Sequence, residues 1–507
     1  MQDGSFSAEP MQAAPQAQAP SLDDLFRRTV ARRPDADALA DPLDKLRITG
    51  QTPRRLTYAQ ADRAVARLAT HFVAAGLPAG SIVALQLPNT VEAMLTTLAA
   101  MRAGLNVALL PQLWRQAELS DAINRIGARA IITTARIDGI DHGEIAMNAA
   151  AEAFSIRQVF AFGEGLPEGV APLDEIAFGP DTLVSDPERS AQRANLITFD
   201  VVADGLRAVP RTQTQVVAGG LAIFLEANVP PGIRMLAATM PSSFAGLCTS
   251  LVTWLLTGGT LALHHPFDPD VLIEQIAEES IALLVAPAPL ALRLGEAGAL
   301  AHLPALTQVI GLWRTPEQAA SSPAWNEQHP FSDLYTFGEA GLFAVRRDGN
   351  GMPAEVPPGA HPPHGSTNAA CETFITKQGT LGLRGAMVPV AAYAPPSNSD
   401  SLLAPRAQTD HVDTAYGARL DRKTGAICIT APPSGVLNVG GYRFLANDLN
   451  DWAQRLPQGG MLTALPDRIS GHRLAGRASD NGRARTALAQ LGLNPLMVEA
   501  FRDRTQS

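Results

Sequence analysis

The chain has 507 residues, of which 46% are hydrophobic and 18% are charged, and its formal net charge is −9. This composition excludes a disordered chain, and the length is enough for a large domain with a small one beside it. The acidic balance argues against nucleic acid as the main partner, because binding phosphates requires a basic face. Cys248, Cys371 and Cys428 show neither metal-site spacing nor a disulfide framework, which indicates a reducing cytoplasm.

The first 20 residues form a Gln/Ala/Pro-rich stretch without an apolar run, so we expect a disordered tail and no signal peptide. No apolar stretch reaches about 18 residues without a charge or a helix breaker, so no membrane span is expected. Lysine is rare: Lys45, Lys377 and Lys423 are the only lysines among 40 basic residues. The segment after Lys423 therefore contains no lysine.

Helix signals come first in chain order. Ser21 and Asp24 predict a capping box that opens a helix through about Arg32. Thr57 and Gln60 predict a second box, followed by apolar residues at helical spacing. That apolar face consists of Ala61, Val65, Leu68, Phe72 and Ala75, with Gly76 as the stop signal.

Short apolar strands then alternate with helices. Residues 82–87 and 106–110 read as strands on either side of a helix that begins at Asn89 or Thr90 and ends before Gly104. This strand–helix–strand order predicts a parallel α/β layer. Further along, 140–190 looks irregular, and a hairpin turn is expected at 421–425. Additional helices are expected at 118–127 and 246–256, and additional strands at 128–133, 235–240, 260–264, 281–287 and 309–311.

Several segments resemble one family. The stretch LQLPNTVEAMLTTLAAMRAGLNVALLPQLWRQAEL (85–119) resembles the N-terminal part of the adenylate-forming superfamily, which includes acyl-CoA ligases, adenylation domains and luciferases. YTFGE (335–339) resembles its Y-G-x-T-E motif. GTLGLRGAMVPV (379–390) resembles its β-rich subdomain, and ARLDRKTGAICITAPPSGVLNVGGYRF (418–444) resembles its hinge.

The resemblance covers roughly residues 20–480 and implies an α/β fold class. The expected organisation is a large N-terminal domain (21–430) of layered α/β subdomains plus a β-rich subdomain. The tail (1–20) is expected to precede this large domain, and a small, truncated C-terminal α+β domain (431–507) is expected to follow it. The resemblance implies that the protein binds ATP or AMP together with Mg²⁺. It also implies CoA as a further cofactor.

The resemblance also assigns roles to individual residues. It implies that Glu339 is catalytic and contacts Mg²⁺ or phosphate; the alternative is a strand end and turn with Glu339 solvated. The other implied nucleotide-binding residues are Tyr335, which would stack on adenine, and Thr336, Gly338, Gly205 and Arg211. The implied acyl pocket draws on 240–250, 309–314 and 335–343, and includes Phe244, Trp313 and Phe337.

The phosphate-binding loop departs from the family pattern T-S-G-T-T-G-x-P-K-G. In its place this chain keeps only Gly205 and the pair Pro210–Arg211, and it has lost the hydroxyl residues. Asp200 and Asp204 stand where phosphates would lie, and like charges at about 4 Å repel by a few kcal/mol at a partly screened site. We therefore expect this segment not to grip a triphosphate in the family's way.

Other catalytic positions have changed as well. Tyr416 replaces the ribose-binding Asp, and a phenol cannot accept hydrogen bonds from two hydroxyls as a carboxylate does. Pro432 and Gly435 replace an Arg and the hinge Asp. The family's C-terminal catalytic lysine has no counterpart after Lys423. The pair His264–His265 lacks ligands at metal spacing and is interpreted as structural.

Three functions are compatible with this pattern. The first is a diverged member, a pseudoenzyme lacking the full adenylation and thioester cycle, that acts as a binding or regulatory partner. The second is an active ATP-dependent carboxylic acid ligase, with Arg207, Arg211 or Arg443 replacing lost cations, or with a protein partner supplying the missing lysine. The third is a hydrolysis or acyl transfer without ATP, although no nucleophile–base pairing is visible in the sequence.

Overall fold

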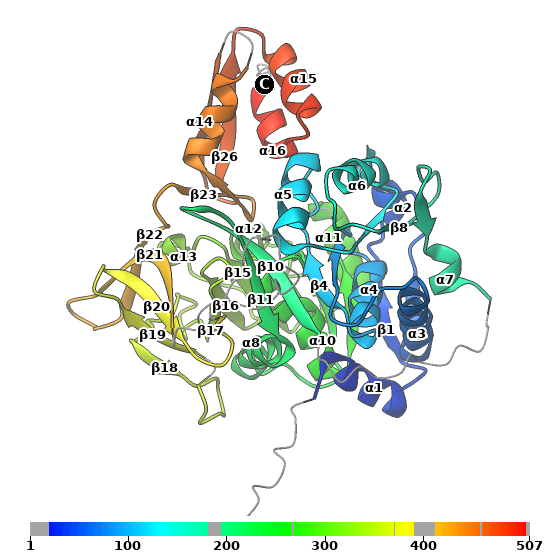
Figure 1. Ribbon diagram of the computed structural model, residues 1–507. Helices are drawn as coiled ribbons and strands as arrows, with labels where there is room; N and C mark the ends of the chain where they lie inside the picture. Colours follow the sequence, from blue (N-terminus) through cyan, green and yellow to red (C-terminus); the bar gives the residue numbers. More distant parts are fainter. Residues whose placement is uncertain are drawn as a thin grey trace, which may run out of the picture.

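A computed structural model describes residues 20–180, 194–265, 268–369, 371–389, 411–456 and 459–502. Figure 1 shows a large α/β body, and a small unit of residues 436–501 that projects from it. The predicted disordered tail lies outside the described residues except for Pro20. None of the helices in the described ranges has the length and hydropathy needed to cross a membrane.

The first sheet of the body has eight strands. They are β1 (Asp37–Ala40), β2 (Arg55–Thr57), β12 (Arg234–Ala237), β13 (Thr260–Leu263), β14 (Leu283–Pro287), β15 (Gln308–Trp313), β16 (Phe331–Thr336) and β17 (Leu342–Arg346). Their order is β17-β16-β15-β14-β12-β13-β1-β2, and all neighbours pair in parallel except for the two edge strands, β2 and β17. The parallel strands are largely buried on both faces, and most of their residues are apolar, although β16 carries Ser332 and Asp333.

The second sheet has seven strands. They are β3 (Ile82–Leu85), β4 (Asn106–Leu109), β5 (Ala130–Thr134), β8 (Gln158–Phe162), β9 (Val170–Pro172), β10 (Asn195–Val202) and β11 (Gly205–Thr212). Their order is β11-β10-β4-β3-β5-β8-β9, with the β10–β11 pair antiparallel. A separate ribbon joins β6 (Arg136–Ile137) to β7 (Ile140–Asp141). The predicted strand–helix–strand layer is confirmed.

One expectation was wrong: residues 140–190 are not irregular where the structure describes them. They contain α6 (His142–Ala151), strands β8 and β9, and α7 (Asp174–Phe178). Helix α6 is rich in alanine and lacks a strong apolar stripe, and β8 is only five residues long. Neither element produces the periodicity on which a sequence-based prediction depends.

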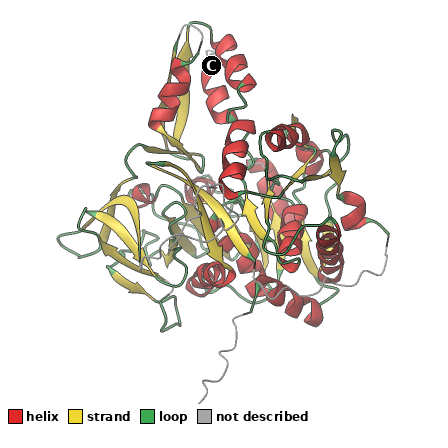
Figure 2. Ribbon diagram, viewed as in Figure 1, coloured by secondary structure: helices red, strands yellow, loops and turns green. Residues whose placement is uncertain are grey.

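Helices surround the sheets, as Figure 2 shows. They are α1 (Leu22–Arg32), α2 (Lys45–Thr49), α3 (Tyr58–Ala74), α4 (Val91–Arg102), α5 (Gln116–Ile126), α8 (Gln213–Glu226), α9 (Phe244–Leu247), the π-helical turn η1 (Cys248–Val252), α10 (Thr253–Thr257), α11 (Pro269–Glu278), α12 (Ala288–Glu296) and α13 (Pro316–Ala319). Both predicted capping boxes are present, at the starts of α1 and α3.

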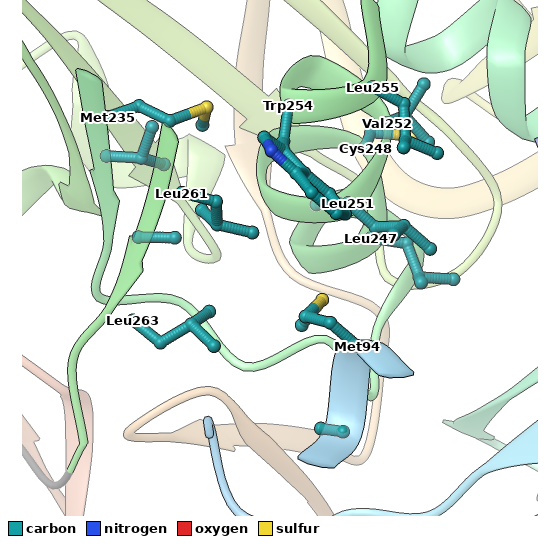
Figure 3. Packing of buried hydrophobic residues seen from close by; sticks show 14 of the residues in the cluster. Met94, Met235, Leu247, Cys248, Leu251, Val252, Trp254, Leu255, Leu261 and Leu263 are labelled. Carbon is teal, nitrogen blue, oxygen red and sulfur yellow. The ribbon is translucent and has the colours of Figure 1, made fainter. Parts of the chain in front are cut away.

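The core lies against helices α4 and α9–α10. All residues of α4 are buried, and Figure 3 shows Met94 of α4 close to Leu263 of β13 and to Leu247 and Leu251 of the α9–α10 helix. Trp254 is fully buried and stacks on Tyr58 with ring centroids 5.8 Å apart. This apolar packing stabilises the body and fixes the strand ends that form the candidate site.

Beyond the body lies a five-stranded antiparallel sheet, the β-rich part. Its strands are β18 (Gly359–His361), β19 (Cys371–Ile375), β20 (Thr380–Arg384), β21 (Val412–Leu420) and β22 (Ile427–Ala431). The turn joining β21 to β22 spans Asp421–Gly425, as predicted. Residue 390, the end of the predicted β-rich segment 379–390, lies outside the described residues.

The small unit has its own sheet and core. It consists of β23 (Val436–Val439), β24 (Tyr442–Leu445), α14 (Ala446–Gln454), β25 (Gly460–Asp467), β26 (Gly471–Ala478), α15 (Asn481–Gln490), α16 (Pro495–Val498) and the 3₁₀ turn η2 (Glu499–Phe501). The strand order is β24-β23-β26-β25. A separate apolar cluster includes Leu462, Leu474, Leu488 and Phe501.

The layered α/β body, the β-rich sheet and the small α+β unit confirm the fold class; the domain limits at 20 and 430 stay predictions. A short turn joins β25, which ends at Asp467, to β26, which begins at Gly471. Asp467 creates this turn, because its carboxylate accepts hydrogen bonds from the backbone N–H groups of Ile469 and Ser470.

Candidate functional site between the body and the small unit

The segment interpreted as a remnant phosphate loop is a regular β-hairpin. Strands β10 and β11 pair from Asn195↔Thr212 to Val202↔Gly205, leaving only two residues in the turn. In an antiparallel ladder of this kind alternate backbone N–H groups bond the partner strand, and successive N–H groups point in opposite directions, so the hairpin offers no run of consecutive donors around a phosphate. Gly205 follows the turn with φ of 112°, a conformation that favours glycine.

The two aspartates of the hairpin lie in different environments. Asp204, in the turn, has a side chain that is 76% exposed and pairs with Arg207 at 3.4 Å. Asp200, in the middle of β10, is 8% exposed and faces the small unit. Only Asp200 therefore occupies the region between the body and the small unit.

Asp200 forms an ion pair with an arginine of the small unit. Its Oδ1 lies 2.7 Å from Nη1 of Arg443, on strand β24. The other nitrogens of Arg443 donate to the Tyr416 hydroxyl at 2.7 Å and to the Asn438 side-chain oxygen at 3.2 Å. We call Asp200, Tyr416, Asn438 and Arg443 the Arg443 cluster. It joins three segments that are far apart in the sequence.

Electrostatics favour the charged form of this arginine. Burial by itself lowers the pKa of Arg443, but Asp200 and Tyr416 outweigh burial and raise that pKa. Burial also raises the pKa of Tyr416, which keeps its hydroxyl protonated. The guanidinium is therefore held in place by one carboxylate and two neutral polar groups.

Gly338 makes room for the Arg443 cluster. Its φ is 56°, and a Cβ at this position would lie 2.2 Å from Arg443 Nη1 and 2.4 Å from Asp200 Oδ2. Any side chain here would displace the ion pair. The glycine of the YTFGE segment is thus required by the close approach of the arginine.

Glu339 lies next to the Asp200–Arg443 ion pair and forms a second polar cluster with Thr198 and Arg211. It is 6% exposed, so the alternative of a solvated carboxylate is wrong. Its Oε2 accepts from Thr198 Oγ1 at 2.5 Å and from the Phe244 backbone N–H at 2.9 Å. Arg211 Nη1 lies 3.6 Å from the same oxygen. Burial raises the pKa of Glu339, while Arg211 opposes that shift.

Arg211 is held on several sides. Its guanidinium stacks over the Phe244 ring at 3.9 Å and donates to Thr198 Oγ1 and to the Glu339 backbone carbonyl. With a side chain only 2% exposed, Arg211 reaches the site from the base of the hairpin. The structure therefore brings predicted residues Arg211, Glu339 and Phe244 together, and Gly205 lies at the far end of β11.

A small cavity of about 100 Å³ remains between the body and the small unit. Arg314, after β15, borders it and donates to the Gly441 carbonyl at 3.2 Å and to Ser243 Oγ at 3.3 Å. Burial lowers the pKa of Arg314, and Glu339 opposes that shift. The lining residues are Pro111, Trp114, Phe199, Asp200, Val201, Met240, Ser242, Ser243, Ala245, Arg314, Thr336, Gly338, Glu339, Asn438, Gly440, Gly441, Tyr442 and Arg443.

The predicted aromatic residues do not share one cavity. Tyr335 packs on Phe343 with ring centroids 4.9 Å apart, and Phe337 contacts Tyr416 edge-on at 5.4 Å. Trp313 donates its indole N–H to Asp333 and borders a different cleft. Thr336 borders the small cavity and donates to the Trp313 carbonyl. Their placement as an acyl pocket stays a prediction.

The residues present do not fit a Mg²⁺–triphosphate group. Both oxygens of Asp200 are used, one by Arg443 and the other by the Glu339 backbone N–H at 2.8 Å. Glu339 Oε2 is surrounded by donors and by a guanidinium rather than by other oxygen ligands. Within the described ranges, no group of three or more His, Cys, Asp or Glu residues is arranged to hold a metal ion.

The two adjacent histidines have structural contacts. Nδ1 of His264 lies 3.0 Å from the Gln275 side-chain oxygen, and Nδ1 of His265 lies 3.3 Å from the Met240 sulfur. Burial lowers the pKa of His265 to about 3, so this imidazole is neutral. These contacts agree with the structural interpretation of the pair.

Comparison with known proteins shows what this chain is similar to. The model of the AMP-binding enzyme family matches residues 26–185. Pyochelin synthase PchD from Pseudomonas aeruginosa strain UCBPP-PA14 is 27% identical over 274 residues, 52% of this chain and 46% of that protein. The chain spans about half the length of the curated relatives it matches.

Solved structures share the fold over nearly the whole chain. The amide bond synthetase McbA from Marinactinospora thermotolerans has a TM-score of 0.67 at 18% identity, with 94% of each chain covered. MbtA from Mycobacterium smegmatis has a TM-score of 0.65 at 19% identity, covering 94% of this chain and 90% of that chain. The chain is thus similar to the AMP-binding enzyme family over residues 26–185 and shares the fold of these solved structures over nearly its whole length.

The sequence named most members of the site but not their pairing. Asp200 and Arg443 were each singled out, one as a misplaced carboxylate and the other as a replacement cation. Arg314 and Asn438 were missed as site residues. A signal was available: Asp200, Tyr416 and Gly338 all stand at altered family motif positions, and changes that occur together indicate contact in space.

Proposed function

We propose that this protein does not perform the complete adenylation cycle and acts as a binding or regulatory partner. The observation that carries this proposal is the Asp200–Arg443 ion pair, which fills the region where the family pattern has its phosphate loop. A cation buried against a carboxylate is costly to separate, because each charge would be left unpaired. The hairpin behind it has no free run of backbone donors for phosphates.

The loss of several charge-stabilising groups supports the same proposal. Removing one such donor typically lowers the rate about 10²–10³-fold. This chain has Tyr416 in place of the ribose-binding Asp and a regular hairpin in place of the phosphate loop. Together these changes would leave little adenylation even if a nucleotide entered the cavity.

The alternative is an active ATP-dependent acid ligase that forms an acyl-AMP and, with CoA or a carrier, a thioester. The observation that favours it is the convergence of Arg211, Arg314 and Arg443 near Glu339, since cations stabilise charge on a transferring phosphoryl group. In that case the Asp200–Arg443 pair would have to open when ATP binds.

Calorimetry with ATP·Mg²⁺ and with AMP separates the two functions. We expect no binding heat at nucleotide concentrations up to about 1 mM, above the usual range of enzyme substrates. A pyrophosphate-release screen over aliphatic and aromatic carboxylic acids should likewise give no signal. Nucleotide binding that disappears in Glu339→Gln but persists in Glu355→Gln, an exposed control, would establish the ligase instead.

A further inference from the structure

The hairpin of β25 and β26 has one face that the rest of the protein does not cover. Leu462 and Leu474 turn inward to the small unit's core, and the missing side chain of Gly476 admits the Phe501 ring. The alternate residues therefore lie on the opposite, outer face. We call these residues the basic face: Met461, Thr463, Leu465, Arg473, Ala475 and Arg477.

The basic face combines apolar and cationic side chains. Met461 is 59% exposed and pairs across the ladder with Arg477, and Leu465 pairs with Arg473. Both arginines are exposed. Within the described part of the chain, neither forms an ion pair within 4.0 Å, and neither does Arg468 in the turn. Water can solvate these arginines, but the exposed Met461 and the half-buried Leu465 opposite them indicate a contact surface.

Charge is divided unevenly between the two parts of the protein. Residues 436–501, the small unit, contain seven arginines and five acidic residues, a net charge of +2. Since the whole chain carries −9, the remaining residues carry −11. The small unit is thus a positively charged projection on an acidic molecule, and such a field attracts acidic partners to it.

The hairpin also offers a free edge and a cleft. Strand β25, eight residues long, is the last strand of its sheet among the described strands, so its outer backbone groups are available for pairing. At its end, the turn residues Pro466, Asp467 and Arg468 border a cleft of about 800 Å³. The opposite wall of the cleft includes the apolar side chains of Pro289, Leu292, Trp313 and Pro323.

We propose that the basic face and the free edge of β25 bind an extended, acidic segment of a partner protein. The segment adds a strand beside β25, places carboxylates on Arg473 and Arg477, and directs an apolar side chain into the cleft at the turn. This inference rests on the proposed function, because it names the chemistry of the partner that a binding protein would need.

A defined peptide tests this directly with the full-length protein. The probe is a fluorescein-labelled dodecapeptide in which glutamate alternates with threonine around one central leucine, and binding is read by fluorescence anisotropy at low salt. We expect saturable binding that Arg473→Glu/Arg477→Glu weakens about tenfold or more. The matched control, Arg483→Glu/Arg485→Glu, changes the charge by the same amount on α15 and should alter binding less than about twofold.

Hydrogen exchange supplies a second measurement. Bound peptide should slow exchange in 460–467, as strand addition requires, and should leave 481–490 unchanged. Circular dichroism and thermal melting confirm that both double variants fold.

Three results would overturn the proposal. One is the absence of saturable binding. Another is an equal loss in both double variants, which would reflect net charge only. The third is concentration-dependent self-association of the protein alone that Arg473→Glu/Arg477→Glu abolishes, which would assign the face to a second copy. Because the probe contains no nucleotide, ATP binding in the calorimetric test would refute the proposed function without changing these results.

Discussion

The apolar core of the body and the Arg443 cluster hold the protein together by different physics. Trp254 and its neighbours are buried by non-directional apolar contacts that many side chains share. The Arg443 cluster depends on a few directional bonds between β10, β21, β23 and β24. The core therefore determines whether the body folds. The cluster determines how the small unit sits on it, and with it what space remains between them.

Removing the largest core side chain should have the largest effect. Trp254→Ala deletes a fully buried indole that stacks on Tyr58 and donates to the Gly259 carbonyl. We expect a loss of about 3–5 kcal/mol in the free energy of unfolding, from lost burial and the cavity left behind. Urea denaturation followed by circular dichroism measures it. A change below about 1 kcal/mol would mean that this part of the core repacks freely.

Breaking the ion pair should have a smaller and more local effect. Arg443→Met leaves the buried Asp200 carboxylate without its cation, which we expect to cost about 3 kcal/mol. Adding Asp200→Asn should recover part of this loss, with a coupling energy of at least about 1 kcal/mol in a double-mutant cycle. Additive effects would contradict the assigned pairing. Hydrogen exchange should quicken in β23 and β24 but not in α4.

The pH dependence of stability tests a third residue, Glu118, near the contact between the body and the small unit. Burial raises the pKa of Glu118, in α5 below the small unit, to about 7 from 4.5. Because the folded state holds this proton more tightly than the unfolded state, stability should fall as the pH rises from about 4.5 to about 7. Glu118→Gln, which keeps the capping geometry, should remove about 1–2 kcal/mol of that decline.

The measurement is the urea concentration at the midpoint of unfolding, determined at several pH values between about 4.5 and about 7. The expected difference between wild type and Glu118→Gln grows with pH. Parallel curves for the two proteins would show that Glu118 is not the group responsible.

Replacing Asp204, the exposed aspartate of the same hairpin, should have the smallest effect on stability. Asp204→Ala removes the solvent-exposed contact with Arg207, and we expect a change below about 0.5 kcal/mol. Thermal melting of Asp204→Ala beside Asp200→Asn gives a direct contrast between two aspartates four residues apart. Equal effects would contradict the difference in burial on which the site rests.

Much of the fold could be predicted because its signals are local. The capping residues Ser21 and Thr57 and the apolar spacing after Thr57 lie within a few residues of the helices they define. The turn at Asp421–Gly425 is likewise set by its own side chain. Helix α6 escaped prediction because an alanine-rich helix is held by its neighbours rather than by a pattern of its own.

The site could be predicted only in its parts. Sequence alone determined the carboxylate at Asp200 and the phenol at Tyr416, both at altered motif positions, since these are properties of single positions. Only the tertiary structure decided that Asp200 meets Arg443, 243 residues away, and that Gly338 lies against both. The physical reason is that an ion pair depends on distance in space, and here that distance is set by the packing of two separately folded cores.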